Sequence, residues 1–313
     1  MKPEVSVVIP TYNVQAYITE CLDSVFASQE ISLQVIVVDN NSSDDTLAIL
    51  SALQQKYEFL LLHEPKQGGS AARNRGLREA RADWVQFLDA DDLLRPAKLR
   101  HQVDLAAQRD LVVGSYSKRS ASGAETIFQS GSGAPWLDLF VTDLGITSAN
   151  LWKTEIVRSI GGFAEDLPSS QEYELMFRYL QSTPEVVYDP APLTVVRERA
   201  GGSVSQSNPQ RKWEHYASLR RRILAHLRAQ PHPFYEARED DLKGAFVDIL
   251  HRLYPYNRRM ATRLYHDAVG AGFRIPPTAP VGKLYRLIYN LSGFQVSGVL
   301  RGARDRWRSL RRS

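Results

Sequence analysis

The stretch Trp84-Val85-Gln86-Phe87-Leu88-Asp89-Ala90-Asp91-Asp92 decides the fold prediction for this chain of 313 residues. Its first half is a short apolar run, which is typical of a buried strand. Three carboxylates follow at once, at the point where a parallel strand would leave its sheet and where open α/β folds bind ligands. Like charges this close repel one another, so the cluster costs stability unless a cation is bound. Carboxylate oxygens suit Mg²⁺ or Mn²⁺. A simpler interpretation is also open, in which an aspartate only caps a following helix near Pro96–Arg109.

Strands and helices alternate around this stretch. The apolar runs predict strands at Val5–Pro10, Leu33–Val38, Phe59–Leu62, Trp84–Leu88 and Leu111–Tyr116, and the amphipathic segments predict helices at Ala16–Ala27, Asp44–Lys56, Ser70–Arg81 and Pro96–Ala107. Strand-helix units of this length indicate right-handed crossovers and a parallel sheet. The sequence therefore predicts an open α/β domain with its ligand cleft at the carboxyl ends of the strands.

Each of the first four predicted strands leads to a polar turn. The turns are Pro10–Asn13, Asp39–Asp44, Gln67–Asn74 and Asp89–Asp92. Any one of them could be only a turn or a helix cap. Four at one edge of a sheet favour a polar site for an anionic ligand. The chain has neither a Gly-x-Gly-x-x-Gly after the first strand nor a Gly-Lys-Ser/Thr, so the dinucleotide fingerprint and the P-loop are excluded.

The composition is that of an ordinary globular protein, with 43% hydrophobic and 24% charged residues. Cys21 is the single cysteine, so an internal disulfide is excluded, and this fits a reducing compartment. We predict that Cys21 is a core thiol. The run Val5–Ile9 is too short for a secretory signal, and no run approaches the ~18 residues of a membrane span. We expect a cytoplasmic protein.

Charge is distributed unevenly along the chain. Residues 1–199 contain 18 Lys and Arg against 27 Asp and Glu, whereas residues 200–313 contain 21 against 8. An acidic front of net charge −9 and a basic rear of +13 indicate different partners for the two parts. Gly, Ser, Asn and Pro accumulate between residues 200 and 209, so we predict an α/β domain over 1–205 and a helical, basic region over 206–313.

The motifs, taken in order, resemble those of family 2 glycosyltransferases with a GT-A fold, of the type that builds bacterial surface polysaccharides. The resemblance covers roughly residues 5–205 and rests on several motifs in familiar order. They are Val5-Ser-Val-Val-Ile-Pro-Thr-Tyr-Asn13, Val37-Val-Asp-Asn-Asn-Ser-Ser-Asp-Asp-Thr46, Gly69-Ser-Ala-Ala-Arg-Asn-Arg-Gly-Leu77, Phe87-Leu-Asp-Ala-Asp-Asp92 and a block from Thr147-Ser-Ala-Asn-Leu-Trp-Lys153 through Gly161-Gly-Phe163 to Gln171-Glu-Tyr-Glu-Leu175.

The resemblance implies roles for residues at the four turns. The base and ribose of a nucleotide-diphosphate sugar would contact Pro10, Thr11, Tyr12 and Asp39, and Arg73 would contact the base or the diphosphate. Asp89 and Asp91 would form the Asp-x-Asp motif for Mn²⁺ or Mg²⁺, with Asp91 the direct ligand and Asp89 nearer the ribose. The chain departs from the family at Asn40, where an acid is usual.

On the acceptor side the family's acid pair reads Gln171-Glu172 here, and the resemblance makes Glu172 the general base. The alternative is a capping box, because Ser169-Ser170-Gln171-Glu172 fits Ser-x-x-Glu before a helix. The resemblance also assigns Trp152, Gln171, Arg197 and Arg199 to the acceptor side. Arg197 and Arg199 either close over the donor diphosphate or are solvated loop charges.

Such an enzyme needs a neutralised leaving diphosphate, a deprotonated acceptor hydroxyl and an in-line arrangement of the two. The family transfers the sugar with inversion, in one displacement and without an enzyme nucleophile, to a hydroxyl of a glycan or lipid-linked acceptor. The competing function is a catalytically silent module that binds nucleotide sugars or glycans. A nucleic-acid-binding rear is a third hypothesis, but no recognised motif supports it, so we expect no nucleic-acid partner.

The rear of the chain predicts helices. Val296, Val299, Leu300, Ala303, Trp307 and Leu310 would share one face of the last helix, with arginines around the rest. A basic amphipathic helix with Trp on its apolar side suits an anionic membrane surface. We therefore predict peripheral attachment to the inner face of the cell membrane through Val296–Ser313. A helix docked on its own domain, an oligomer contact and a frayed tail are the alternatives.

Overall fold

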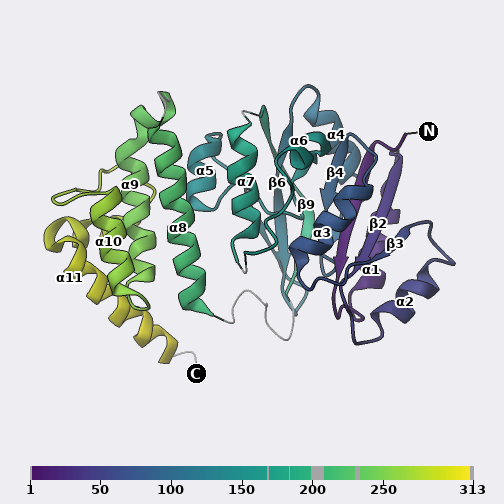
Figure 1. Ribbon diagram of the computed structural model, residues 1–313, viewed down its shortest axis with the longest axis horizontal. Coiled ribbons are helices and arrows are strands. Elements are labelled where there is room, and N and C mark those ends of the chain that lie inside the picture. Colours follow the sequence, from purple (N-terminus) through teal and green to yellow (C-terminus); the bar gives the residue numbers. More distant parts are fainter. Residues whose placement is uncertain (1, 168, 183, 199–207, 230–232, 311–313) are drawn as a thin grey trace. The chain divides into compact units, whose positions relative to one another are not determined.

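The computed structural model describes residues 2–167, 169–182, 184–198, 208–229 and 233–310, with the side chains of 233 and 302–310 outside the description (Figure 1). The chain divides into two compact units, Met1–Gly202 and Ser203–Ser313. The sequence placed this boundary three residues later, after residue 205.

The first unit is built around one sheet of nine strands. Its strands are β1 (Val5–Thr11), β2 (Leu33–Asp39), β3 (Leu60–His63), β4 (Trp84–Phe87), β5 (Leu93–Leu94), β6 (Leu111–Arg119), β7 (Glu125–Phe128), β8 (Leu151–Lys153) and β9 (Val186–Arg197). Its helices are α1 (Ile18–Phe26), α2 (Thr46–Leu53), α3 (Gly69–Glu79), α4 (Lys98–Ala106), α5 (Pro135–Val141), α6 (Thr154–Ser159) and α7 (Gln171–Gln181). All nine predicted elements are present, with ends that differ by a few residues.

The strand order is β3-β2-β1-β4-β8-β6-β9-β5, with β7 paired to β6. The first four strands are parallel, as the crossover pattern predicts. β8 then runs antiparallel to both β4 and β6, while β6 and β9 are parallel. The sequence did not reveal β5, β7, β8 or β9, because strands of two to four residues show no readable period and β9 contains Pro190 and Pro192.

The register brings the ends of three strands together. Thr11 at the end of β1 pairs with Asp39 at the end of β2, and the Leu88 amide donates to the Val8 carbonyl at 3.0 Å. Helix α3 packs tightly over β1, since a Cβ on Gly76 would lie 2.4 Å from a methyl of Val8. This close approach needs glycine, and it holds the polar amino end of α3 near the same edge of the sheet.

The core of this unit follows the predicted pattern. Ile18, Cys21, Leu22 and Val25 of α1 are buried, which confirms Cys21 as a core thiol. Burial raises the pKa of that thiol far above its usual range, so Cys21 is unsuited to act as a nucleophile.

The second unit is helical in its described residues. It contains α8 (Pro209–Arg228), α9 (Pro233–Leu253), α10 (Arg258–Ala268) and α11 (Lys283–Leu310), of which α8, α9 and α10 pack together (Figure 1). The backbone of α11 is broken at Gly293, where φ is 73° and ψ is −179°. No described helix combines the length and apolar character that crossing a bilayer requires.

Candidate active site

The turn Asp89–Asp92 follows β4 and is closed by a hydrogen bond from the Asp92 amide to the Asp89 carbonyl at 2.9 Å. The Asp89 amide donates to Ser148 Oγ at 3.1 Å, which ties the turn to the segment before β8. β5 lies between this turn and α4, and the residue before α4 is Ala97. The alternative in which an aspartate of this turn caps the next helix is therefore wrong.

The three carboxylates have different surroundings. Asp92 is buried, and burial followed by the charges of Asp89 and Asp91 raises its pKa well above its usual range. The Asp89 side chain is 41% exposed, and Asp91 is partly exposed. Asp89 and Asp91 are thus open to a ligand, while Asp92 is buried within the turn.

Arg73 of α3 forms an ion pair with Asp89, its guanidinium donating to Oδ1. The guanidinium also lies 5.3 Å from the ring centre of Phe163, a cation–π distance. Gly68, with φ 138°, is the cap residue of α3, the helix that carries Arg73. The structure therefore brings two predicted donor-binding residues, Arg73 and Asp89, together.

The turn fits a divalent cation only when a ligand helps to hold it. Among the described residues, no three side chains from His, Cys, Asp and Glu gather around one metal position. Mg²⁺ and its relatives are commonly held by one or two carboxylates together with substrate phosphates and water. Asp91 and Asp89 supply that donor set, so the residues present are compatible with a cation bound alongside a diphosphate.

The predicted nucleotide side lies at the ends of β1 and β2. Asp39 is buried, and its Oδ2 accepts from the Ser42 amide at 3.3 Å, while its Oδ1 has no hydrogen-bond partner among the described residues. A buried acceptor without a donor is costly, and a ligand hydroxyl would remove that cost. Pro10 is partly exposed and Tyr12 is exposed. Thr11 is buried, and its hydroxyl donates to the Val38 carbonyl at 3.2 Å.

Asn40 has a structural role that explains the departure from an acid. Its Nδ2 donates to the carbonyls of Glu64 and Lys66, both at 2.8 Å, and its Oδ1 accepts from the Gly68 amide at 2.7 Å. Aspartate could not donate to two carbonyls. Asn40 thus joins β2 to the loop that begins α3.

Glu172 lies in the first turn of α7, partly buried. Its Oε1 accepts hydrogen bonds from the hydroxyl of Thr147, at 2.6 Å, and from the amide of the same residue. Burial raises the pKa of Glu172 to about 7, with the charge of Asp89 adding to the rise and the bonds from Thr147 opposing it. Its carboxylate is therefore electrostatically coupled to the aspartate turn.

The capping-box alternative for Glu172 is wrong. α7 begins at Gln171, its cap residue is Ser170 in a left-handed conformation, and that residue makes no side-chain cap bond. Glu172 is consequently the second residue of the helix, and its carboxylate is turned toward Thr147 rather than back to the cap.

Trp152 requires a correction. Its side chain is fully buried in β8, between β4 and β6, with its ring 5.2 Å from that of Tyr179. A side chain inside the sheet core cannot contact an acceptor, so the acceptor-side assignment of Trp152 is wrong. Gln171 is partly buried, and its side-chain amide donates to the Leu167 carbonyl at 2.5 Å.

Arg197 is part of the site but is not a solvated charge. Its side chain is only 10% exposed, and it donates to Glu20 at 2.5 Å and to the Tyr17 carbonyl at 3.2 Å. Its Nε donates to the Asp91 carbonyl and its amide to Asp92 Oδ1. Arg197 thus fixes the aspartate turn from β9, while Arg199 lies outside the described residues.

Two residues that hold the site were not assigned roles from the sequence, and a third, Arg197, was assigned a different one. Thr147 holds Glu172, Ser148 holds Asp89, and Arg197 binds the backbone of the turn. Thr147 and Ser148 stand in one of the recognised motifs, which was the available signal. Their contacts depend on strand pairing that the sequence does not reveal.

Comparison with known proteins identifies the family. The profile of the family described as "Glycosyl transferase family 2" matches residues 6–163, half of the chain. The chain belongs to glycosyl transferase family 2. The matched region contains all four polar turns and ends before Glu172.

Curated relatives resemble parts of this family member. It is 34% identical over 104 residues to the succinoglycan biosynthesis protein ExoO of Rhizobium meliloti, covering 33% of this chain and 30% of that protein. It is 26% identical over 193 residues to an uncharacterized glycosyltransferase of Rickettsia felis, covering 58% of this chain and 32% of that protein. The matches thus span only about a third of these relatives' own length.

Solved structures share the fold. S. aureus TarS 1–349, in complex with UDP-GlcNAc, superposes with a TM-score of 0.61 at 19% identity, covering 94% of this chain and 81% of that one. The mannosyltransferase PcManGT of Pyrobaculum calidifontis, in complex with GDP-Man and Mn²⁺, gives 0.55 at 20% identity, covering 97% and 88%. The first unit therefore has the GT-A fold, with a helical region following it.

Proposed function

We propose that this glycosyltransferase is a metal-dependent, inverting enzyme that moves a sugar from a nucleotide-diphosphate donor to a hydroxyl of a glycan or lipid-linked acceptor. The observation that carries the proposal is Glu172, a carboxylate of raised pKa held by Thr147 and coupled to Asp89. A general base works best when its pKa lies near the working pH.

In the proposed reaction Glu172 accepts the proton of the acceptor hydroxyl. The acceptor oxygen forms a bond to the anomeric carbon as the bond from that carbon to the diphosphate oxygen breaks. One displacement inverts the configuration, so no enzyme nucleophile is required, in keeping with the buried Cys21. Thr147 acts as a positioning residue, because its two hydrogen bonds fix the direction of the Glu172 carboxylate.

The donor would occupy the edge where β1, β2 and β4 end. Asp39 would accept from a ribose hydroxyl through Oδ1, which has no hydrogen-bond partner in the described part of the chain, beside Pro10, Thr11 and Tyr12. Arg73 would exchange part of its bond to Asp89 for the diphosphate. Folds of this type have been solved with UDP-GlcNAc and with GDP-Man and Mn²⁺, which supports a nucleotide-sugar donor.

Asp91 and Asp89 would hold Mn²⁺ or Mg²⁺ beside that diphosphate. When bound, the cation would offset the negative charge that develops on the leaving group. Arg197 would contribute without touching the donor, because it sets the backbone position of Asp91.

The proposed location is the cytoplasmic face of the membrane, with Val296–Ser313 in contact with anionic lipid. The exposure of Val296, Val299 and Leu300 supports this proposal. The predicted continuation of that face through Ala303, Trp307 and Leu310 falls on side chains outside the description.

The test uses UDP-, GDP- and dTDP-sugars. A donor should raise the melting temperature with Mn²⁺ present, and product from a soluble acceptor, examined by proton NMR, should have the anomeric configuration opposite to that of the donor. Retained configuration would contradict the mechanism. If a donor binds but is neither hydrolysed nor transferred to any acceptor, the result would instead favour the silent binding module.

A further inference from the structure

The first part of α11 exposes three leucines. Leu284 is 69% exposed, Leu287 55% and Leu291 76%. Positions three and seven residues apart lie on the same side of a helix, so these leucines form one continuous apolar strip. A single exposed leucine is ordinary, but a strip of three marks an interaction surface.

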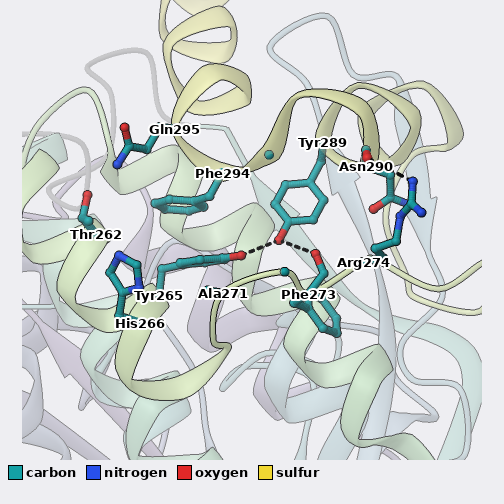
Figure 2. A pocket seen from close by; sticks show the side chains of 12 residues that line it. Thr262, Tyr265, His266, Ala271, Phe273, Arg274, Tyr289, Asn290, Phe294 and Gln295 are labelled. Atoms are coloured by element: carbon teal, nitrogen blue, oxygen red, sulfur yellow. Dashed lines mark hydrogen bonds between the residues drawn. The ribbon is translucent and has the colours of Figure 1, made fainter.

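This strip is not a poorly packed part of the helix, because the opposite side of α11 is anchored. Tyr289 is almost fully buried, and its hydroxyl bonds to that of Tyr265 at 2.9 Å and to the Phe273 carbonyl at 3.1 Å (Figure 2). Asn290, at the edge of the strip, also accepts from the Ile275 amide at 2.8 Å. The helix is held by one face and presents the other.

The break at Gly293 is equally well specified. Phe294, the next residue, stacks on Tyr265 with ring centres 4.2 Å apart (Figure 2). Beyond it Ser297 and Gly298 are buried, whereas Val296 is 53% exposed, Val299 55% and Leu300 52%. Both sides of the break therefore turn a packed face inward and leave an apolar face uncovered.

The surroundings of the leucine strip are basic. Lys283 is exposed at the start of the helix, and Arg274 donates to the Asn290 carbonyl at 3.4 Å. On a helical projection, positions 283 and 290 border the strip beside Leu287. Residues 200–313 have a net charge of +13, so a second copy of this surface would be repelled and an anionic partner attracted.

We propose that Leu284, Leu287 and Leu291 form, together with Val296, Val299 and Leu300, a two-part apolar surface that docks on an anionic lipid bilayer. The sequence pattern had indicated only the part after the break. The inference deepens the proposed peripheral location of the glycosyltransferase and rests on it. Apolar side chains would enter the acyl boundary, and the neighbouring Lys and Arg would meet the headgroups.

The test is co-sedimentation of the full chain with vesicles of phosphatidylcholine alone and of equal parts phosphatidylcholine and phosphatidylglycerol. The unchanged protein should bind the anionic vesicles at low salt and hardly bind the neutral ones. The triple variant Leu284→Gln, Leu287→Gln, Leu291→Gln should bind more than about tenfold more weakly, because each leucine loses its apolar transfer. Lys283→Gln should weaken binding about fivefold at low salt and less at high salt.

Matched controls separate docking from general surface polarity. Leu47 and Leu60 of the first unit are 42% and 41% exposed, and Leu47→Gln with Leu60→Gln should leave vesicle binding unchanged. Leu291→Gln alone changes the most exposed of the three leucines and should lower vesicle binding without lowering the melting temperature.

Defined outcomes would overturn the inference. These are unchanged binding of the triple variant, no binding of the unchanged protein to anionic vesicles, or a dimer that the leucine substitutions dissociate. Donor turnover on a soluble acceptor is measured in parallel. Vesicle binding without turnover would refute the proposed enzyme and leave the docking surface standing, whereas turnover without leucine-dependent binding would do the reverse.

Discussion

In the first unit the carboxylates of Asp39 and Asp92 are almost wholly buried, whereas in the second unit Leu284 and Leu291 are more than two-thirds exposed. Both arrangements are unfavourable for an isolated chain. A buried carboxylate loses its hydration, and an exposed leucine side chain remains in contact with water. The kind of cost indicates the kind of partner. We therefore propose a polar, charged ligand for the first unit and an apolar surface with anionic groups for the second.

The titratable groups of the two units differ in the same way. The pKa of Glu172 is raised, in part by the charge of Asp89. Asp89 and Asp91 are both partly exposed, so the aspartate turn is accessible to a ligand. His251 of α9 is fully buried, and both of its ring nitrogens are occupied, by Tyr285 at 2.6 Å and by the Phe294 carbonyl at 2.8 Å. The proposed chemistry rests on the first group, whereas the second is enclosed in the packed interior of its unit.

The largest expected effect would break the chemical side of this comparison. Glu172→Gln keeps the side-chain length and can still bond to Thr147, but it cannot accept a proton. We expect kcat to fall by roughly 10²–10⁴-fold, with donor affinity nearly unchanged. In the unchanged enzyme, kcat should fall as the pH drops below about 7, since the protonated acid is no base.

Glu174→Gln is the matched control for this variant. Glu174 lies on the same helix, is buried and pairs with Arg178 at 2.8 Å, so its loss should affect the melting temperature rather than kcat. If Glu172→Gln turned over like the unchanged enzyme, the base would have to be sought elsewhere.

A smaller effect is expected at the aspartate turn. UDP at 100 times its Kd should stabilise the unchanged protein by about 2.7 kcal/mol when Mn²⁺ is present. Asp91→Asn should remove most of the Mn²⁺-dependent part without lowering the melting temperature of the free protein, because it relieves repulsion among the carboxylates. Thermal shift with and without Mn²⁺ measures both quantities.

Asp83→Asn provides the comparison, since Asp83 is exposed just before β4 and pairs only at the surface with Lys2 at 2.6 Å. This substitution should leave the response to Mn²⁺ intact. Equal UDP affinity with and without Mn²⁺ in the unchanged protein would make the metal assignment wrong.

The smallest effect concerns His251 and sharpens the packing side. Burial lowers its pKa to about 4, with Arg301 adding to the decrease and the Phe294 carbonyl and Asp248 opposing it. Unfolding exposes a histidine of ordinary pKa about 6.5, so the unfolded state binds the additional proton. Stability should be unaffected above about pH 6.5 and should decrease as the pH falls toward 4, by about 2 kcal/mol at pH 5.

Denaturant unfolding at pH 8 and pH 5 tests this expectation. His251→Gln should lower stability at pH 8 and lose about 2 kcal/mol less than the unchanged protein between the two pH values. His266→Gln, at an exposed position of α10, should keep the full pH dependence. An identical pH dependence in the His251 variant would show that burial of this imidazole is not its source.

The sequence determined the alternating strands and helices of the first unit, the buried face of α1 and the meeting of four polar turns at one edge. These features depend on local periodicity and on the rule that parallel strands share an orientation. Motif order also identified the family, and the resemblance predicted that Glu172 and the aspartates belong to one site.

Only the tertiary structure decided which side chains hold that site and which faces remain uncovered. Arg197 lies 105 residues from Asp92, and no local pattern could pair them. Trp152 was misassigned because its burial in β8 depends on pairing with β4 and β6, which both precede β8 by many residues. The exposed leucines of α11 have a sequence pattern that core packing would also produce. Whether an apolar strip faces the core or the solvent is set by the helices packed around it, and these depend on long-range contacts.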